Sequence, residues 1–204
     1  MRITRIETIV IRHPWGPPEG GVMRDWLTVR VHADNGLTGI GRGGDAGLIN
    51  GELAPLLRGK DPRRTAALGD EMYEAAGQYR GPGAAAMSSI GAIDIALWDI
   101  AGKIADMPCH QLWGGPVRDW IRTYCHLGGG RMEDFYQIPA AGAGRFGDLA
   151  SAAVEQGYTA FKSMAVPPTA PITGTKPIHR AVAAVAAMRD AVGDDIDIMV
   201  DCHA

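Results

Sequence analysis

The sequence is poor in cysteine, and its three cysteines follow no pairing pattern. Cys109, Cys125 and Cys202 show no CxxC spacing, so the sequence offers neither a disulfide framework nor a thiolate zinc motif. No signal peptide is evident, and we expect a reducing, cytoplasmic environment. A His follows each cysteine, yet neighbours on a strand face opposite ways, so one metal ion could not readily take both side chains. We therefore expect all three cysteines to act as packing residues.

The sequence also lacks an excess of charge of one sign and any long apolar run. Its formal net charge is -3, with Lys and Arg scattered along the chain, so there is no basic stripe for nucleic acid or anionic lipid. The longest apolar stretches are interrupted before the ~20 residues that a membrane span requires. The composition, 46% hydrophobic and 21% charged, is typical of a soluble globular protein. We expect neither nucleic acid nor a membrane as a partner.

The first 115 residues predict an α+β domain with a small antiparallel sheet. Apolar and polar residues alternate around Val29 and Val31, and Asp34-Asn35-Gly36 is a strong hairpin turn. Three strands are expected, at residues 3–12, 26–33 and 37–41. Loops are expected at residues 13–24, which are rich in Pro and Gly, and at residues 42–50.

Two helices are expected to complete this domain. The first has Asp61 as its cap and Pro62 at the first helical position, and it runs through Ala76. The second spans residues 84–105, where apolar side chains recur at three- and four-residue steps. Asp106-Met107-Pro108 ends that pattern.

After Gly114-Gly115 the sequence alternates between strands and helices. The expected elements are strand 121–126, helix 147–156, strand 158–164, helix 178–192 and strand 196–201. This βαβαβ order predicts a parallel sheet, and strand starts 37 and 38 residues apart are typical of a (β/α)₈ barrel. Such a barrel needs about 250 residues, so three strands cannot close it. We therefore expect a cap domain at residues 1–115 and a truncated TIM-type barrel domain at residues 116–204.

Catalytic residues of such barrels lie at the C-terminal ends of the strands. Asp201 and His203 are two residues apart on an extended segment, so a carboxylate and an imidazole should point the same way. Lys162 lies in a strand that we expect to be buried on both faces, where a lysine is costly unless it is paired or functional. Plainer alternatives stay open: Asp201 as a turn former, His203 as a solvated residue, and Lys162 as a lysine that extends its ammonium to the rim.

Two glycine patterns, at residues 39–44 and 142–147, match GxGxxG by letters. The first leaves an antiparallel hairpin and the second lies well past its strand. Neither has the strand–turn–helix context of a dinucleotide site. The sequence also contains no Walker-type phosphate loop.

Three segments have specific amino-acid sequences that are shared, in the same order along the chain, with a known family. They are residues 36–41 (GLTGIG), 92–103 (AIDIALWDIAGK) and 111–115 (QLWGG). They resemble the cap domain, and the helix and loop leading into the barrel, of the mandelate-racemase-like group of the enolase superfamily. Residues 79–82 (YRGP) and 201–203 (DCH) look more like the acid-sugar dehydratases of that group, galactonate and mannonate dehydratase in particular.

The resemblance implies roles for individual residues. Asp201 would bind Mg²⁺, and His203 would act as the acid that assists departure of the 3-hydroxyl of a sugar acid. Similarity to mannonate dehydratase implies Asn50 and His126 as substrate contacts. Racemases and cycloisomerases of the group carry Lys-x-Lys where this chain has Lys162-Ser163-Met164. Lys162 therefore remains a catalytic candidate, while the second lysine, the usual base, is missing.

The implied function is a magnesium-dependent dehydratase that removes the proton next to a carboxylate and eliminates the 3-hydroxyl, giving a 2-keto-3-deoxy acid. Its remaining metal ligands and its base would lie on later strands, absent from this chain. Two alternatives stay open. One is a racemase or cycloisomerase of the same group, and the other is a catalytically incomplete chain that acts only in folding or oligomerisation. The family also implies a homo-oligomer whose partner is a small sugar acid.

Overall fold

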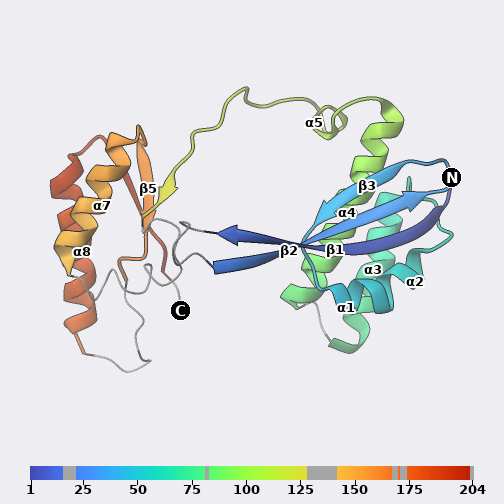
Figure 1. Cartoon of the computed structure of the whole chain (residues 1–204), viewed down its shortest axis with the longest axis horizontal. Helices are drawn as coiled ribbons and strands as arrows, with labels where there is room; N and C mark the ends of the chain where they lie inside the picture. Colours follow the sequence, from blue (N-terminus) through green and yellow to red (C-terminus); the bar gives the residue numbers. More distant parts are fainter. Residues whose placement is uncertain (16–21, 81–82, 128–141, 167–169, 171–173, 203–204) are drawn as a thin grey trace. The chain divides into compact units, whose positions relative to one another are not determined.

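The structure, a computed structural model, has two compact units, each with its own sheet and core (Figure 1). Unit 1 comprises Met1–His13 and Arg24–Asp119, and unit 2 comprises Pro14–Met23 and Trp120–Ala204. The residues that the structure describes are 1–15, 22–80, 83–127, 142–166, 170 and 174–202. The domain boundary expected at residue 115 stays a prediction.

Unit 1 contains a three-stranded sheet in the order β1-β2-β3. The strands are β1 (Ile3–Trp15), β2 (Val22–Ala33) and β3 (Thr38–Arg42). β2 pairs antiparallel with β3, and the Asn35 side chain accepts the N–H of Leu37 at 3.2 Å in the turn between them. The predicted meander is confirmed. β1 and β2 reach into the segment predicted as a loop, residues 13–24, of which residues 16–21 lie outside the described part.

The second predicted loop, residues 42–50, is wrong in its latter half. Helical structure begins with α1 (Ala46–Leu48) and continues through the π-helix η1 (Ile49–Leu53) and α2 (Ala54–Leu57). The Asp45 carboxylate caps the start by accepting the N–H of Leu48 at 2.8 Å. The apolar residues at positions 49, 53 and 57 are four apart and fully buried. This helical spacing is the signal that the neighbouring glycines obscured.

The helix predicted from Asp61 begins later, because α3 spans Thr65–Arg80. The Asp61 carboxylate accepts the backbone N–H of Arg63 at 3.0 Å and pairs with its guanidinium at 2.6 Å. These hydrogen bonds from Arg63 hold the pKa of Asp61 well below its usual range. The cap residue thus closes a local turn before the helix.

The predicted helix at residues 84–105 is confirmed as α4 (Ala84–Ala105), and the short α5 (Cys109–Leu112) follows it. α4 lies directly on β3. A Cβ added at Gly39 would come within 1.9 Å of the Ala96 carbonyl oxygen, and one at Gly41 within 1.8 Å of that of Ala92. The first GxGxxG pattern therefore supplies glycines that close helix–strand packing requires.

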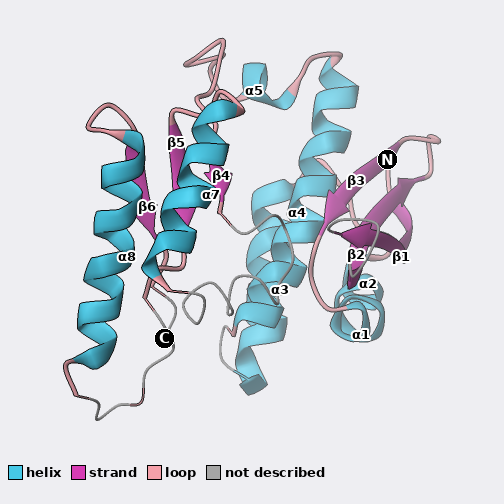
Figure 2. Cartoon of the chain, turned by 60° about the vertical axis from the view of Figure 1, so that its left-hand side comes forward, coloured by secondary structure: helices cyan, strands magenta, loops and turns pink. Residues whose placement is uncertain are grey.

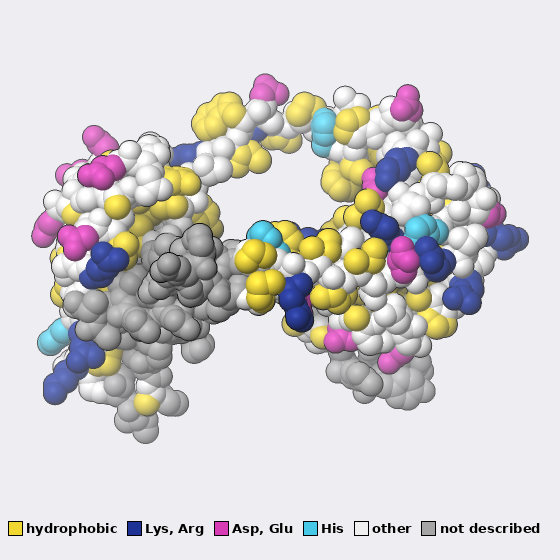
Figure 3. Space-filling model, in the orientation of Figure 1, with side chains coloured by type: hydrophobic (Ala, Val, Ile, Leu, Met, Phe, Trp, Pro, Cys, Tyr) yellow, Lys and Arg dark blue, Asp and Glu magenta, His cyan; other side chains and the backbone are white. Residues whose placement is uncertain are grey.

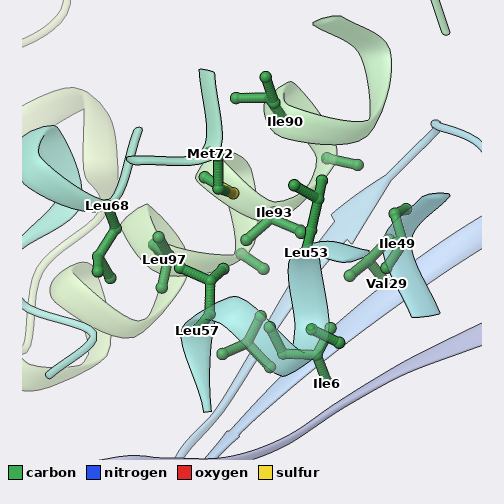
Figure 4. Close-up of a cluster of buried hydrophobic side chains, with 14 of the residues drawn as sticks. Ile6, Val29, Ile49, Leu53, Leu57, Leu68, Met72, Ile90, Ile93 and Leu97 are labelled. Atoms are coloured by element: carbon green, nitrogen blue, oxygen red, sulfur yellow. The ribbon is translucent and has the colours of Figure 1, made fainter. Parts of the chain in front are cut away.

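The core of unit 1 combines residues of the sheet with residues of the helices, including Val29, Leu68 and Ile93 (Figure 4). By length and composition alone, α4 could cross a membrane. Yet Ile93 and Leu97 are fully buried in this core, so α4 is the core helix of unit 1. On the face shown in Figure 3, basic and acidic side chains are mixed over the unit.

Unit 2 contains a parallel sheet in the order β4-β5-β6. Its strands are β4 (Cys125–His126), β5 (Ala160–Ser163) and β6 (Asp197–Val200), and its helices are α7 (Ala143–Glu155) and α8 (Lys176–Val192). α7 and α8 pack against each other beside the sheet (Figure 2). Phe146, Phe161 and Met188 are fully buried between these layers. The predicted βαβαβ order is confirmed.

The first strand of unit 2 is shorter than the predicted segment 121–126. Arg122 holds the preceding residues by its side chain: Nε donates to Thr159 Oγ1 at 2.9 Å, and a terminal nitrogen donates to the Thr159 carbonyl oxygen at 2.6 Å. Arg122 also forms an ion pair with Asp197. The guanidinium thus ties the residues before β4 to the starts of β5 and β6, which are themselves joined by the hydrogen bond from the Asp197 N–H to the Thr159 carbonyl oxygen at 3.1 Å.

Candidate active site

The two faces of the β4-β5-β6 sheet differ in chemistry. Phe161 and its register partner Ile198 join the core beneath the helices. Because side chains alternate along a strand, the next row of partners, His126, Lys162 and Met199, lies on the opposite face. The candidate site lies on this second face, at the C-terminal ends of the strands.

An ion pair joins two of the predicted site residues. Lys162 Nζ lies 2.8 Å from an Asp201 carboxylate oxygen, and both side chains are 27% exposed. The backbone N–H of Asp201 donates to the Ser163 carbonyl oxygen at 2.8 Å, which fixes the residue just beyond β6. The hydrogen bond to Asp201 raises the pKa of Lys162. The expectation that both faces of this strand are buried is confirmed for Ala160 and Phe161, which point to opposite faces, and Lys162 itself is half-buried.

Tyr124 lies beside the candidate site, although it was not predicted from the sequence. Lys162 Nζ lies 5.8 Å from the centroid of the Tyr124 ring, within the range of a cation–π contact. The available signal was spacing: Tyr124 precedes His126 by two residues, so an extended backbone brings both side chains to one face.

His126 is half-buried at the end of β4, beside Lys162 in the strand register. Its Nδ1 lies 2.9 Å from the Leu127 carbonyl oxygen, and it donates there when it carries the proton. The structure therefore brings His126, Lys162 and Asp201 to one edge of one sheet.

The other two predicted site residues lie elsewhere. Asn50 is an exposed residue of the π-helix in unit 1, and its amide nitrogen donates to Thr8 Oγ1 at 2.8 Å. π-helical turns are frequent at functional sites. His203 lies outside the described residues.

The cysteines agree only partly with the expected packing role. Cys125 packs at the edge of the core of unit 2, where burial raises its pKa. Cys109 is half-buried, and its Sγ donates to the Trp98 carbonyl oxygen at 3.3 Å. Cys202 is exposed, so the expectation is wrong there. It lies beyond the last residue that hydrogen-bonds to β5.

Asp201 offers one hard oxygen donor of the kind that Mg²⁺ prefers. Within the part of the chain that the structure describes, no three His, Cys, Asp or Glu side chains come together as a possible metal site. The chemistry of Asp201 therefore fits a divalent metal as one ligand of a larger set, and Lys162 is the charge partner of this carboxylate in the structure.

Two family models match the chain. The model described as "Mandelate racemase / muconate lactonizing enzyme, N-terminal domain" matches residues 8–114, just over half of the sequence. The chain belongs to this family. Residues 145–204 match the "Enolase C-terminal domain-like" model. The predicted fold class is confirmed: the mandelate racemase / muconate lactonizing enzyme cap domain precedes the start of an enolase-type barrel.

Curated relatives in this family are named D-galactonate dehydratase. The chain is 36% identical over 209 residues to the protein of Verminephrobacter eiseniae, with coverage of 100% of this chain and 48% of that protein. It is 38% identical over 184 residues to the protein of Xanthomonas campestris pv. campestris, with coverage of 87% and 45%. The chain spans about half the length of the curated relatives it matches.

Solved structures of the mandelate racemase / muconate lactonizing enzyme family share the fold. A member of the enolase superfamily from Salmonella Typhimurium gives a TM-score of 0.79 at 28% identity, over 100% of this chain and 55% of the other. A mandelate racemase/muconate lactonizing enzyme from Jannaschia sp. CCS1 gives 0.78 at 27% identity, over 100% and 54%. Here too the chain corresponds to about half of each protein.

Proposed function

We propose that the protein is a magnesium-dependent dehydratase of a sugar acid, of the D-galactonate dehydratase kind. One observation carries the proposal: the Lys162–Asp201 ion pair at the C-terminal ends of neighbouring parallel strands. Catalytic groups of β/α barrels gather at this edge. The names of the relatives support the reaction class.

Lys162 and Asp201 place opposite charges at one point of the sheet edge. When bound, a divalent metal supplies positive charge that stabilises the negative charge developing on the substrate carboxylate. Asp201 provides one oxygen ligand for it. Lys162, which is an ammonium at neutral pH and whose pKa is raised further by its hydrogen bond to Asp201, donates hydrogen bonds to the same substrate oxygens.

The remaining candidate residues act on the hydroxyl groups of the sugar acid. His126 and Asn50 contact substrate hydroxyls. His203, as imidazolium, gives its proton to the oxygen of the 3-hydroxyl while the carbon–oxygen bond breaks. Water leaves, and the resulting enol tautomerises to the 2-keto-3-deoxy acid.

Met164 favours dehydration over racemisation. It is two residues beyond Lys162, at the position where racemases of the group carry their lysine base, and it is buried and apolar. A thioether cannot remove the proton next to a carboxylate. We assign that proton to a base outside these 204 residues, in keeping with the half-length match to the relatives.

A dehydration assay tests the proposal on the longest protein that the gene encodes. Incubation with Mg²⁺ and a panel of five- and six-carbon sugar acids should yield a 2-keto-3-deoxy product from at least one of them. Lys162→Ala should lower kcat/KM by about a hundredfold or more, the usual cost of losing one donor to a developing oxyanion. Asp201→Asn should abolish turnover at the same Mg²⁺ concentration.

Asp195→Asn is the matched control, because Asp195 is an exposed carboxylate in the turn that precedes β6, whereas Asp201 follows that strand. It should keep full activity. No turnover of any sugar acid contradicts the proposal. Exchange of the α-proton with solvent, without loss of water, favours the racemase or cycloisomerase alternative.

A further inference from the structure

Two serines of α4 hold the segment that leads to Asn50. The backbone N–H of Gly44 donates to Ser88 Oγ at 3.0 Å, and that of Asp45 donates to Ser89 Oγ at 2.9 Å. Ser89 Oγ itself donates to the Ala85 carbonyl oxygen at 2.8 Å. We name Ser88 and Ser89 the serine pair.

The serine pair lies where α4 is otherwise apolar. Ser89 is fully buried, and its neighbour Ile90 belongs to the core. An alanine would suit the helix better than a serine at such a position. The hydroxyl instead satisfies a backbone donor of another segment, so the residue serves the connection between β3 and α1 and not the helix itself.

The connecting backbone lies too close to α4 for any side chain. A Cβ added at Gly44 would come within 2.8 Å of Ser89 Cα and 2.9 Å of Ile49 Cδ1. Gly44 also has a φ of 91°, in the region that favours glycine. The segment is therefore fixed on the helix by hydrogen bonds and by contact.

The fixed segment continues directly into the π-helix. Asp45, bound to Ser89, accepts the N–H of Leu48 with its carboxylate at 2.8 Å and the N–H of Ile49 with its carbonyl oxygen at 3.0 Å. Ile49 is buried against the core (Figure 4). The next residue is Asn50, exposed and bonded to Thr8.

We propose that Ser89, assisted by Ser88, is a positioning residue that fixes the backbone carrying Asn50, a proposed substrate contact. The inference rests on the proposed function, in which Asn50 contacts a hydroxyl of the sugar acid. Ser89 acts through Asp45 and the cap of α1. Its hydroxyl is also small enough for Gly44 to approach, so neither alanine nor threonine can replace it.

Amide hydrogen exchange on the full-length protein tests, without any substrate, whether Ser89 holds the segment that leads to Asn50. Ser89→Ala should speed exchange at residues 44–50 by about tenfold, because a buried hydrogen bond is lost. Ser89→Cys, which keeps size and a weak hydrogen-bonding group, should recover part of the protection. Ser163→Ala, at a buried serine in the other unit, should change nothing at residues 44–50. Unchanged exchange in Ser89→Ala overturns the proposal.

A double-mutant cycle in the dehydration assay tests whether Ser89 acts on the substrate through Asn50. Ser89→Ala should raise KM and leave kcat nearly unchanged, as loss of a substrate contact does. Added to Asn50→Ala, it should cost almost nothing further, because both changes remove one interaction. Fully additive losses overturn the positioning role. Faster exchange in a protein that turns over no sugar acid would contradict the proposed function while leaving the structural half supported.

Discussion

At the scale of single residues, two fully buried serines differ in hydrogen bonding. Among the described residues Ser163 Oγ has no partner, whereas Ser89 Oγ makes two hydrogen bonds. Ser163→Ala removes an unsatisfied buried hydroxyl, so we expect it to raise the free energy of unfolding by up to about 1 kcal/mol. Chemical denaturation of Ser163→Ala, Ser89→Ala and the parent protein measures these free energies of unfolding.

Ser89→Ala is the control for that measurement. It leaves the Asp45 N–H without its acceptor, and we expect a loss of about 1–3 kcal/mol. A destabilised Ser163→Ala would show that its hydroxyl is satisfied, contrary to the first expectation.

The positions of Lys162 and Asp201 near strand ends could be predicted, because the order of strands and helices limits where strand ends fall. Asp201 and Lys162 were identified by position, and the structure pairs them at 2.8 Å. Their pairing could not be predicted, since it depends on the register between β5 and β6. The position of Tyr124 beside Lys162 likewise depends on the register between β4 and β5. Sequence spacing alone says nothing about contacts between strands.

At the scale of elements, contact between α4 and β3 depends on the absence of side chains. A Cβ at Gly41 would overlap the Ala92 carbonyl oxygen at 1.8 Å, so the helix and strand must separate. We expect Gly41→Ala to lower the free energy of unfolding by about 2–4 kcal/mol. Thermal or denaturant unfolding measures it.

Gly69→Ala is the matched change in a helix, since a Cβ at Gly69 in α3 meets nothing within 4 Å. It should stabilise the protein by up to about 1 kcal/mol through helix propensity. Equal changes in the free energy of unfolding for the two substitutions would mean that the contact with α4 does not restrict the side chain at position 41.

Long periodic elements were predictable, and short ones were not. α4 has the bounds that its apolar spacing indicated, because a 22-residue pattern averages out local exceptions. The three-residue α1 depends on one cap, Asp45, and on burial of residues that follow it. The start of α3 was misplaced for a similar reason, since Asp61 bonds to Arg63. Capping residues serve turns and helices alike, and only tertiary contacts decide between them.

At the scale of the whole molecule, the chain contains three parallel strands in the part that matches an enolase-type barrel domain. It spans about half the length of its relatives, and in its described residues Asp201 has no two acidic, His or Cys neighbours placed to complete a metal site. One carboxylate paired with a lysine attracts Mg²⁺ weakly, because the ammonium already neutralises its charge and a hydrated Mg²⁺ gives up water reluctantly. Tight binding requires further carboxylates.

A calorimetric titration of Mg²⁺ into the 204-residue chain and into the longest protein that the gene encodes should therefore separate the two. We expect saturable binding only in the longer protein, accompanied by a rise in its Tm with Mg²⁺ concentration, as binding to the folded state requires. Asp201→Asn should remove both effects, and Asp195→Asn should keep them. If neither length binds Mg²⁺, Asp201 is not a metal ligand. If the longer protein binds Mg²⁺ equally well with Asp201→Asn, other residues hold the metal. The Lys162–Asp201 ion pair then only stabilises the edge of the sheet.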